Sequence, residues 1–247
     1  MELLIMIDAM KRASAGRINA IIPYYGYARQ DRKAKARDPI TAKLVADLIM
    51  AAGADRVLTM DLHANQIQGY FDIPVDHLLG MPIIAKYFKE KQMEDLVVVS
   101  PDHGSVTRAR NLAEFLNCPI AIIDKRRPEP NKSEIMNIIG NIDGKNCIII
   151  DDMISSGESM IDVASELKKR GASRVFCATT FGLFTNGFKK FDEAYENGII
   201  DRILTTNLVY QPTELLSKPW YINVDMSKYM ALLIDTPVSY THLTLPT

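Results

Sequence analysis

The sequence predicts an α/β protein whose sheets are mostly parallel and flanked by helices. Short runs rich in β-branched residues alternate with amphipathic stretches, which is the pattern of repeated strand and helix units. The helix candidates begin or end at proline, glycine or asparagine, the residues that start and stop helices. A length of 247 residues and a hydrophobic content of 47% suffice for one large domain or two ordinary ones.

The alternation of the two patterns predicts a helix or a strand for most segments of the chain. The first ten residues begin acidic and then show helical spacing, so we expect the chain to start inside a helix and not with a secretory leader. Strands are predicted at residues 19–23, 56–61, 96–100, 119–124, 147–151, 174–180 and 202–205. Helices are predicted at residues 41–52, 82–92, 106–116, 159–170 and 226–234.

Two prolines bracket a connection at residues 74–82, which separates two series of strands and helices. We therefore place a domain boundary near Gly80, with a first domain at residues 1–79 and a second at residues 80–236. Residues 237–247 show no helical period and no apolar face, and we predict that they are a non-native tail.

The composition limits the classes of partner. A net charge of -1, from 29 basic and 30 acidic residues, gives no reason to expect a nucleic acid or a membrane surface as a partner. The apolar runs stop well short of the length of a membrane span. Cys118, Cys147 and Cys177 are odd in number and lie in or beside apolar runs, which predicts reduced core residues in a cytoplasmic protein.

The most informative segment is residues 151–159, where a buried apolar run leads into an acidic pair, a turn of small residues and a helix. Ionised Asp151 and Asp152 suit a ribose diol, because they can accept hydrogen bonds from its hydroxyls. Gly157, the serine hydroxyls and the helix N-terminus suit a phosphate dianion. Ligands of open α/β sheets bind at this end of the strands. The alternative is that the carboxylates cap the turn and Ser159 caps the helix.

Three further segments also follow predicted strands. Residues 61–76 place His63 in a polar turn, where it is either a metal ligand or a hydrogen-bonded structural residue. Residues 23–33 gather aromatics and cations, which suits a nucleotide but also a solvated basic loop. Residues 124–130 form a basic, proline-rich stretch, which we interpret as either a closing loop over a polyphosphate or an exposed loop.

These four segments together resemble the ribose-phosphate pyrophosphokinase family. Residues 61–76 match the family signature of aspartate, leucine, histidine and a small residue, then glutamine, glycine, two aromatics and a proline before aspartate. The likeness runs from about residue 2 to residue 234, and includes residues 13–17, 27–31, 101–102, 123–128 and 151–159.

The resemblance implies two phosphoribosyltransferase-type domains, the first of them incomplete, with ATP and ribose 5-phosphate held between them. The implied reaction moves the pyrophosphoryl group of ATP to the anomeric hydroxyl of the sugar, giving phosphoribosyl pyrophosphate and AMP. The resemblance also implies dependence on Mg²⁺ and a homo-oligomer in which dimers assemble into a hexamer.

Roles carried over by position fall on four regions. The resemblance assigns Arg29 and Gln30 to ATP, and His63 and Asp102 to magnesium. It assigns the stabilisation of the transferring group to Lys125 and Arg127. For ribose 5-phosphate it assigns the hydroxyls to Asp151 and Asp152, and the phosphate to Ser155, Ser156, Gly157, Glu158 and Ser159.

The sequence departs from the family pattern at several places. After the acidic pair, relatives commonly carry Asp-Thr-Gly-Gly-Thr, so Ser155 lacks a carboxylate and Glu158 adds a negative charge beside the phosphate. Many relatives have two glycines where this chain has Gly104 and Ser105. A strand-rich N-terminal segment of the family has no counterpart here, and we expect apolar helix faces of the first domain to be uncovered.

Two other functions remain open. The first is a non-catalytic regulatory or assembly subunit, which keeps the fold; retention of residues such as His63, Asp102 and Asp151 argues against it. The second is an ordinary phosphoribosyltransferase, which needs the 151–159 segment but neither the 61–76 signature nor the Arg29 loop.

Overall fold

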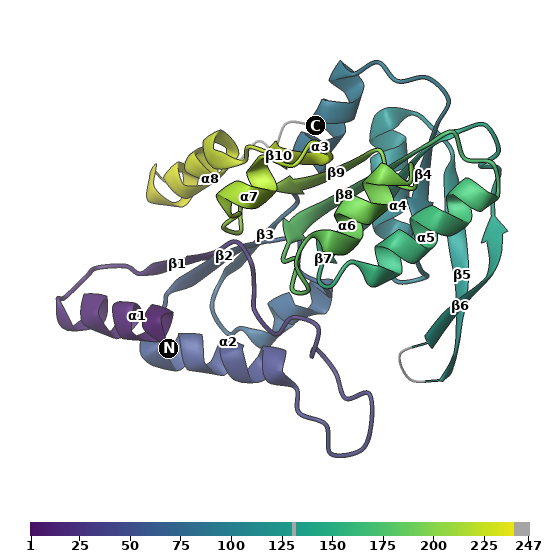
Figure 1. Ribbon diagram of the computed structural model, residues 1–247. Helices are drawn as coiled ribbons and strands as arrows, with labels where there is room; N and C mark the ends of the chain where they lie inside the picture. The colour runs from purple at the N-terminus through teal and green to yellow at the C-terminus, as the bar shows by residue number, and fades with distance from the viewer. Residues whose placement is uncertain (130–131, 240–247) are drawn as a thin grey trace. The chain divides into compact units, whose positions relative to one another are not determined.

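The computed structural model describes residues 1–129 and 132–239 (Figure 1), and the side chains of residues 125–129, 132–136 and 236–239 lie outside this description. The described chain divides into two compact units, one of Met1–Leu79 with residues 234–239, and the other of Gly80–Leu233. Each unit contains its own sheet.

The first unit is a parallel sheet of three strands in the order β1-β2-β3. Ile7, Ala46 and Ile49 from two helices pack with Val57 of the central strand, and all four are buried. The elements are α1 (Glu2–Arg12), β1 (Asn19–Ile22), α2 (Thr41–Ala52), β2 (Arg56–Met60), the 3₁₀ helix η1 (Asn65–Tyr70) and β3 (Val75–Leu78).

The second unit is a seven-stranded sheet in the order β10-β9-β8-β7-β4-β5-β6, parallel except for the antiparallel pair of β5 and β6. Its elements are α3 (Met81–Glu90), β4 (Leu96–Ser100), α4 (Val106–Leu116), β5 (Ile120–Glu129), β6 (Lys132–Ile139), β7 (Asn146–Ile154), α5 (Glu158–Lys169), β8 (Arg174–Gly182), α6 (Lys189–Glu196), β9 (Arg202–Thr206), α7 (Thr213–Leu216) and β10 (Tyr221–Val224). Helix α8 (Ser227–Ser239) begins in this unit, and its residues from Ile234 belong to the first unit.

Helices cover both faces of the larger sheet (Figure 1). In β7, Cys147 and Ile149 pack with α5 and α6 on one face, while Ile148 and Ile150 pack with α3 and α4 on the other. This alternation follows from the two-residue period of a strand. Because both faces are buried, the strand is a continuous apolar run, which is typical of a parallel sheet.

The predicted fold class is confirmed, and the predicted bounds of α2, β4 and α4 match the structure. Strands β3, β6 and β10 and helices α6 and α7 were not predicted. The sequence runs of the three strands are short or carry polar residues, so no apolar period marks them, and the two helices are short.

Three predicted segments need correction. The connection at residues 74–82 contains β3, which pairs with β2 in parallel. Residues 124–129, predicted as a loop, continue β5 because the chain returns as β6 and supplies antiparallel partners such as Ile135 for Lys125. The closing helix extends beyond residue 234 to Ser239, and residues 240–247 of the predicted tail lie outside the described residues.

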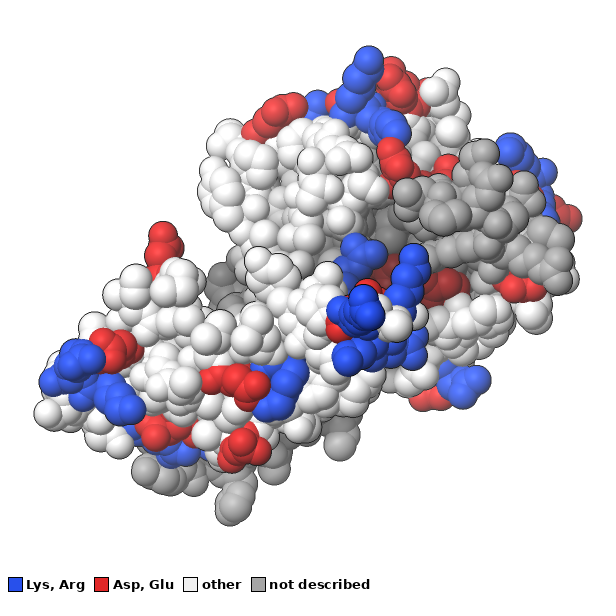
Figure 2. Space-filling model, turned by 90° about the horizontal axis from the view of Figure 1, so that it is seen from below, with Lys and Arg blue, Asp and Glu red and all other residues white. Residues whose placement is uncertain are grey.

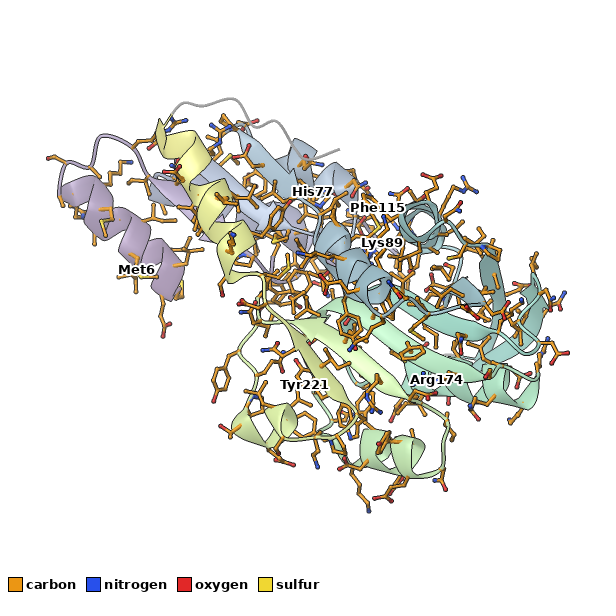
Figure 3. The ribbon with its side chains drawn as sticks, turned by 90° about the horizontal axis from the view of Figure 1, so that it is seen from above. Met6, His77, Lys89, Phe115, Arg174 and Tyr221 are labelled. Atoms are coloured by element: carbon orange, nitrogen blue, oxygen red, sulfur yellow. The ribbon has the colours of Figure 1, made fainter. Side chains whose placement is uncertain are left out.

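Exposed apolar side chains gather on the helices of the first unit. Ile5, Met6 and Met10 of α1 and Leu44 and Leu48 of α2 are all exposed (Met6 is labelled in Figure 3). Uncovered apolar helix faces were expected in this unit. Among the described residues, no helix is both long and apolar enough to cross a membrane. Basic and acidic side chains are interspersed on the face that Figure 2 shows.

Candidate active site

The acidic pair lies within β7, a central strand that continues past its predicted end at residue 151 to Ile154, and a short turn then leads to α5. Asp152 is buried at 3% exposure, whereas Asp151 is partly exposed. The carbonyl of Gly157, the N-cap of α5, accepts hydrogen bonds from the amides of Met160 (3.0 Å) and Ile161 (3.0 Å). The first amides of α5 therefore open toward the turn, where a helix N-terminus attracts an anion.

Gly157 is required by the close packing beneath this turn. Its φ is +83°, and a Cβ at this position would lie 2.0 Å from Cζ of the buried Phe191. The Phe191 ring stacks on Trp220 with ring centroids 5.6 Å apart. Trp220 Nε1 in turn donates to Asp192 Oδ1 at 2.8 Å, and Lys218 pairs with the same carboxylate. The turn thus rests on a fixed aromatic support.

The Asp151 carboxylate is held by two hydrogen bonds to one oxygen. Ser105 Oγ donates to Asp151 Oδ1 at 2.9 Å, and the Asp152 amide donates to the same oxygen at 2.9 Å. Burial raises the pKa of Asp151 to about 7; the neighbouring Asp152 carboxylate acts in the same direction and the Ser105 hydrogen bond opposes both. The surroundings of Asp151 thus favour its protonated form more than those of an exposed aspartate do.

Asp102 lies at the carboxyl end of β4, the strand that neighbours β7. Its Oδ1 accepts a hydrogen bond from the Ser105 amide at 3.0 Å, and its carbonyl accepts one from Ser100 Oγ at 2.6 Å. His103 Nε2 lies 3.3 Å from Oδ1 of Asp124, which is on β5. Ser105 thus links Asp102 to Asp151, and His103 links the same loop to Asp124 of the adjacent strand β5.

Glu158 is paired with a cation that the sequence analysis did not identify. Lys190 of α6 forms an ion pair with Glu158 at the first turn of α5, and both side chains are at least half exposed. The two residues are 32 positions apart, so no local pattern marks the pair. The carboxylate that was expected to oppose a phosphate therefore has its own counter-ion.

The predicted nucleotide residues Arg29 and Gln30 are exposed and follow β1 in the first unit. Gln30 is anchored at the start of α2, because its side-chain oxygen accepts a hydrogen bond from the Thr41 hydroxyl and its carbonyl accepts one from the Ala42 amide at 3.2 Å. Tyr25 donates to the Ala42 carbonyl at 2.9 Å. The loop is thus tied to the helix while Arg29 remains exposed.

His63 is exposed between β2 and η1. The loop around it is fixed by its neighbours, since Gln66 Nε2 donates to Asp31 Oδ2 at 2.8 Å and the Tyr70 hydroxyl donates to the Asp31 carbonyl. His63 belongs to the first unit and Asp102 to the second. The backbones of Lys125 and Arg127 lie in β5, and their side chains are outside the described residues.

Within residues 1–129 and 132–239, no three His, Cys, Asp or Glu side chains gather to form a metal site. Mg²⁺ keeps several waters and is commonly bound through one or two carboxylates together with substrate phosphates. A single oriented carboxylate such as Asp102 therefore fits Mg²⁺, and would not suffice for a structural metal bound by protein ligands alone.

Comparison with known families matches two models to the chain. The N-terminal domain of ribose phosphate pyrophosphokinase matches residues 1–53, and the phosphoribosyl transferase domain matches residues 75–218. The second match includes β7, the acidic pair and the turn before α5.

Individual relatives agree with these models. The ribose-phosphate pyrophosphokinase of Clostridium perfringens is 64% identical over 216 residues, which are 86% of this chain and 66% of that protein. That of Clostridium tetani is 63% identical over 85% of this chain and 65% of that protein. The chain thus spans about two thirds of the length of these curated relatives.

A solved structure gives the same result in three dimensions. The phosphoribosylpyrophosphate synthetase from Mycobacterium smegmatis superposes with a TM-score of 0.89 at 39% identity, covering 98% of this chain and 78% of that one.

Proposed function

The chain belongs to the ribose-phosphate pyrophosphokinase family, and we propose on that basis that it transfers the pyrophosphoryl group of ATP to ribose 5-phosphate. The products are phosphoribosyl pyrophosphate and AMP. The observation that carries this proposal is the last part of β7 and the turn to α5, where a carboxylate pair on a central parallel strand is followed by a helix N-terminus.

Ribose 5-phosphate binds along this turn. Asp151 and Asp152 accept hydrogen bonds from the ribose hydroxyls, and residues 155–159 hold the 5-phosphate through backbone amides and serine hydroxyls. The close contact of Gly157 with Phe191 supports this role, since it fixes the backbone whose amides must converge on the phosphate. The ion pair from Lys190 reduces the repulsion between Glu158 and the phosphate.

Arg29 and Gln30 bind ATP in the first unit. The anchoring of Gln30 to α2 supports this assignment, because a fixed loop loses less conformational entropy when it binds a nucleotide. Lys125 and Arg127 stabilise charge on the transferring group, an assignment that rests on their positions in the family pattern.

Mg²⁺ is the proposed cofactor, with His63 and Asp102 as its protein ligands. The orientation of Asp102 Oδ1 by the Ser105 amide supports a role for this carboxylate in binding a hard cation. The bound ion would supply electrostatic stabilisation of the polyphosphate.

The reaction is an in-line displacement. The anomeric hydroxyl oxygen forms a bond with the β-phosphorus of ATP, and the bond from that phosphorus to the oxygen bridging the α- and β-phosphates breaks. AMP leaves with the bridging oxygen, and the hydroxyl proton passes to water. The protein orients the two reactants and stabilises the developing charge, the main contributions of proteins to phosphoryl-type transfer.

We further propose that the protein is cytoplasmic and forms a homo-oligomer of dimers assembled into a hexamer. Free thiols at Cys118, Cys147 and Cys177 support a reducing compartment. The exposed apolar residues of α1 and α2 support self-association, because surfaces of this kind commonly mark protein interfaces.

The test is the formation of AMP. The protein is incubated with ATP, Mg²⁺ and ribose 5-phosphate, and AMP and phosphoribosyl pyrophosphate are quantified together by ³¹P NMR. Equal amounts of both products, lost when ribose 5-phosphate is omitted and in the Asp152→Asn variant, support the proposal. A folded protein that binds both substrates and forms no AMP refutes it and indicates a regulatory subunit.

A further inference from the structure

Ser105 contacts both carboxylates that lie at the carboxyl ends of β4 and β7. Its hydroxyl donates to Asp151 Oδ1 at 2.9 Å, and its amide donates to Asp102 Oδ1 at 3.0 Å. The residue is buried at 8% exposure and lies 46 positions before Asp151. One small residue therefore links the loop after β4 to the acidic pair of β7.

Helix capping does not account for this hydroxyl. Ser105 is the N-cap residue of α4, but its side chain forms no capping hydrogen bond. The helix begins instead through the Ser105 carbonyl, which accepts a hydrogen bond from the Ala109 amide at 2.9 Å. The hydroxyl oxygen of an N-cap serine usually accepts a hydrogen bond from a helix amide, so its use on a distant carboxylate is a tertiary feature.

The consequence for Asp151 is geometric. The Ser105 hydroxyl and the Asp152 amide both reach Oδ1, which fixes the plane of the carboxylate. Both hydrogen bonds fall on Oδ1 and leave the other oxygen, Oδ2, available as an acceptor. The Ser105 hydrogen bond lowers the pKa of Asp151 and so opposes the larger upward shift that burial causes.

We propose that Ser105 is a positioning residue for the ribose hydroxyls, which holds Asp151 Oδ1 so that Oδ2 accepts a hydrogen bond from the sugar. This inference rests on the proposed binding of ribose 5-phosphate at residues 151–159. It adds a residue that acts through Asp151 and does not touch the substrate.

The experiment pairs a change in the protein with a change in the ligand. Binding of ribose 5-phosphate, 2-deoxyribose 5-phosphate, 3-deoxyribose 5-phosphate and inorganic phosphate is measured by calorimetry for the parent, Ser105→Ala and Ser105→Thr. Ser217→Ala is the matched control, since that exposed hydroxyl donates to the Glu214 carbonyl near the end of α7.

Ser105→Ala is expected to weaken ribose 5-phosphate binding about tenfold, the effect of one hydrogen bond to a charged group. Ser105→Ala should not change the affinity for the deoxy sugar that lacks the hydroxyl bound by Asp151. It should also leave the affinity for inorganic phosphate unchanged. Ser105→Thr keeps the hydroxyl and should restore most of the affinity. In kinetics, Ser105→Ala should raise KM for ribose 5-phosphate more than it lowers kcat.

Equal binding of ribose 5-phosphate by the parent and Ser105→Ala would overturn the inference. Equal weakening for all four ligands would also overturn it, because it would indicate a general structural effect. The proposed function is judged separately by AMP formation: a parent that forms AMP with no effect of Ser105→Ala refutes only the positioning role. A parent that binds the sugar phosphate without forming AMP refutes only the reaction.

Discussion

Gly157 is the position where a single methyl group should be most damaging to the candidate site. Alanine there must adopt a φ of +83°, and its Cβ would lie 2.0 Å from Cζ of Phe191. Phe191 is buried and stacked on Trp220, so the ring has no open space to enter. Either the turn or the aromatic support must therefore shift.

The expected loss in the free energy of unfolding has two components, one from the backbone and one from packing. A left-handed backbone costs an L-residue about 1–2 kcal/mol, and the lower entropy of the unfolded alanine chain offsets about 0.4–1 kcal/mol of it. Overpacking of a rigid core adds about 1–3 kcal/mol. Gly157→Ala should thus lower the free energy of unfolding by about 1–5 kcal/mol.

Gly198→Ala separates these two costs. Gly198 has a similar φ of +66°, but a Cβ there would meet nothing within 4 Å. This variant should carry only the backbone cost and lose at most about 1–2 kcal/mol. The difference between the two alanine variants then measures the contact with Phe191.

Trp220 supplies the assay, because it is the single tryptophan of the chain and lies in the aromatic support itself. Urea unfolding followed by its fluorescence reports on the second unit. Adding Phe191→Leu to Gly157→Ala removes the ring atoms that clash, so the double variant should be more stable than the sum of the single effects, by about 1 kcal/mol or more. Equal stability of the two alanine variants, or strict additivity with Phe191→Leu, would refute the reasoning.

Two further predictions concern charge. Lys190→Ala should weaken ribose 5-phosphate binding about two- to fivefold at low salt and much less at high salt, and it should have no such effect when Glu158→Gln is already present. Titration calorimetry checks both expectations. A Lys190→Ala effect that is undiminished at high salt would contradict a screened ion pair between Lys190 and Glu158. Because the pKa of Asp151 is raised, the folded state holds more protons than the unfolded state between about pH 4 and 7, so stability should fall as pH rises through that window, by on the order of 1 kcal/mol per pH unit. Urea unfolding at several pH values should show that Asp151→Asn removes this slope, and an unchanged slope would contradict the assignment.

Much of the site could be predicted from the sequence because its signals are local. The run of apolar residues before Asp151 indicates a strand buried on both faces, and Gly157 after two serines indicates a turn into a helix. Both elements are present, although the strand continues through the acidic pair to Ile154 before the turn begins. The family assignment rests on similar local strings, and the comparisons confirm it.

The rest depends on contacts between distant segments. The extension of β5 through Lys125 requires a returning partner strand, which a proline-rich basic sequence does not indicate. Likewise, β3 exists because its backbone pairs with β2, not because of a strong apolar period.

The sequence by itself determined the fold class, the family, and the acidic pair and turn that precede α5, since each depends on residue types at short spacing. Only the tertiary structure decided the surroundings of that turn. Ser105 reaches Asp151, Lys190 reaches Glu158 and Phe191 supports Gly157 because adjacent strands and helices bring residues about 30 or more positions apart into contact. Hydrogen bonds and packing at such separations leave no pattern along the chain, and they set the charge and rigidity of the site.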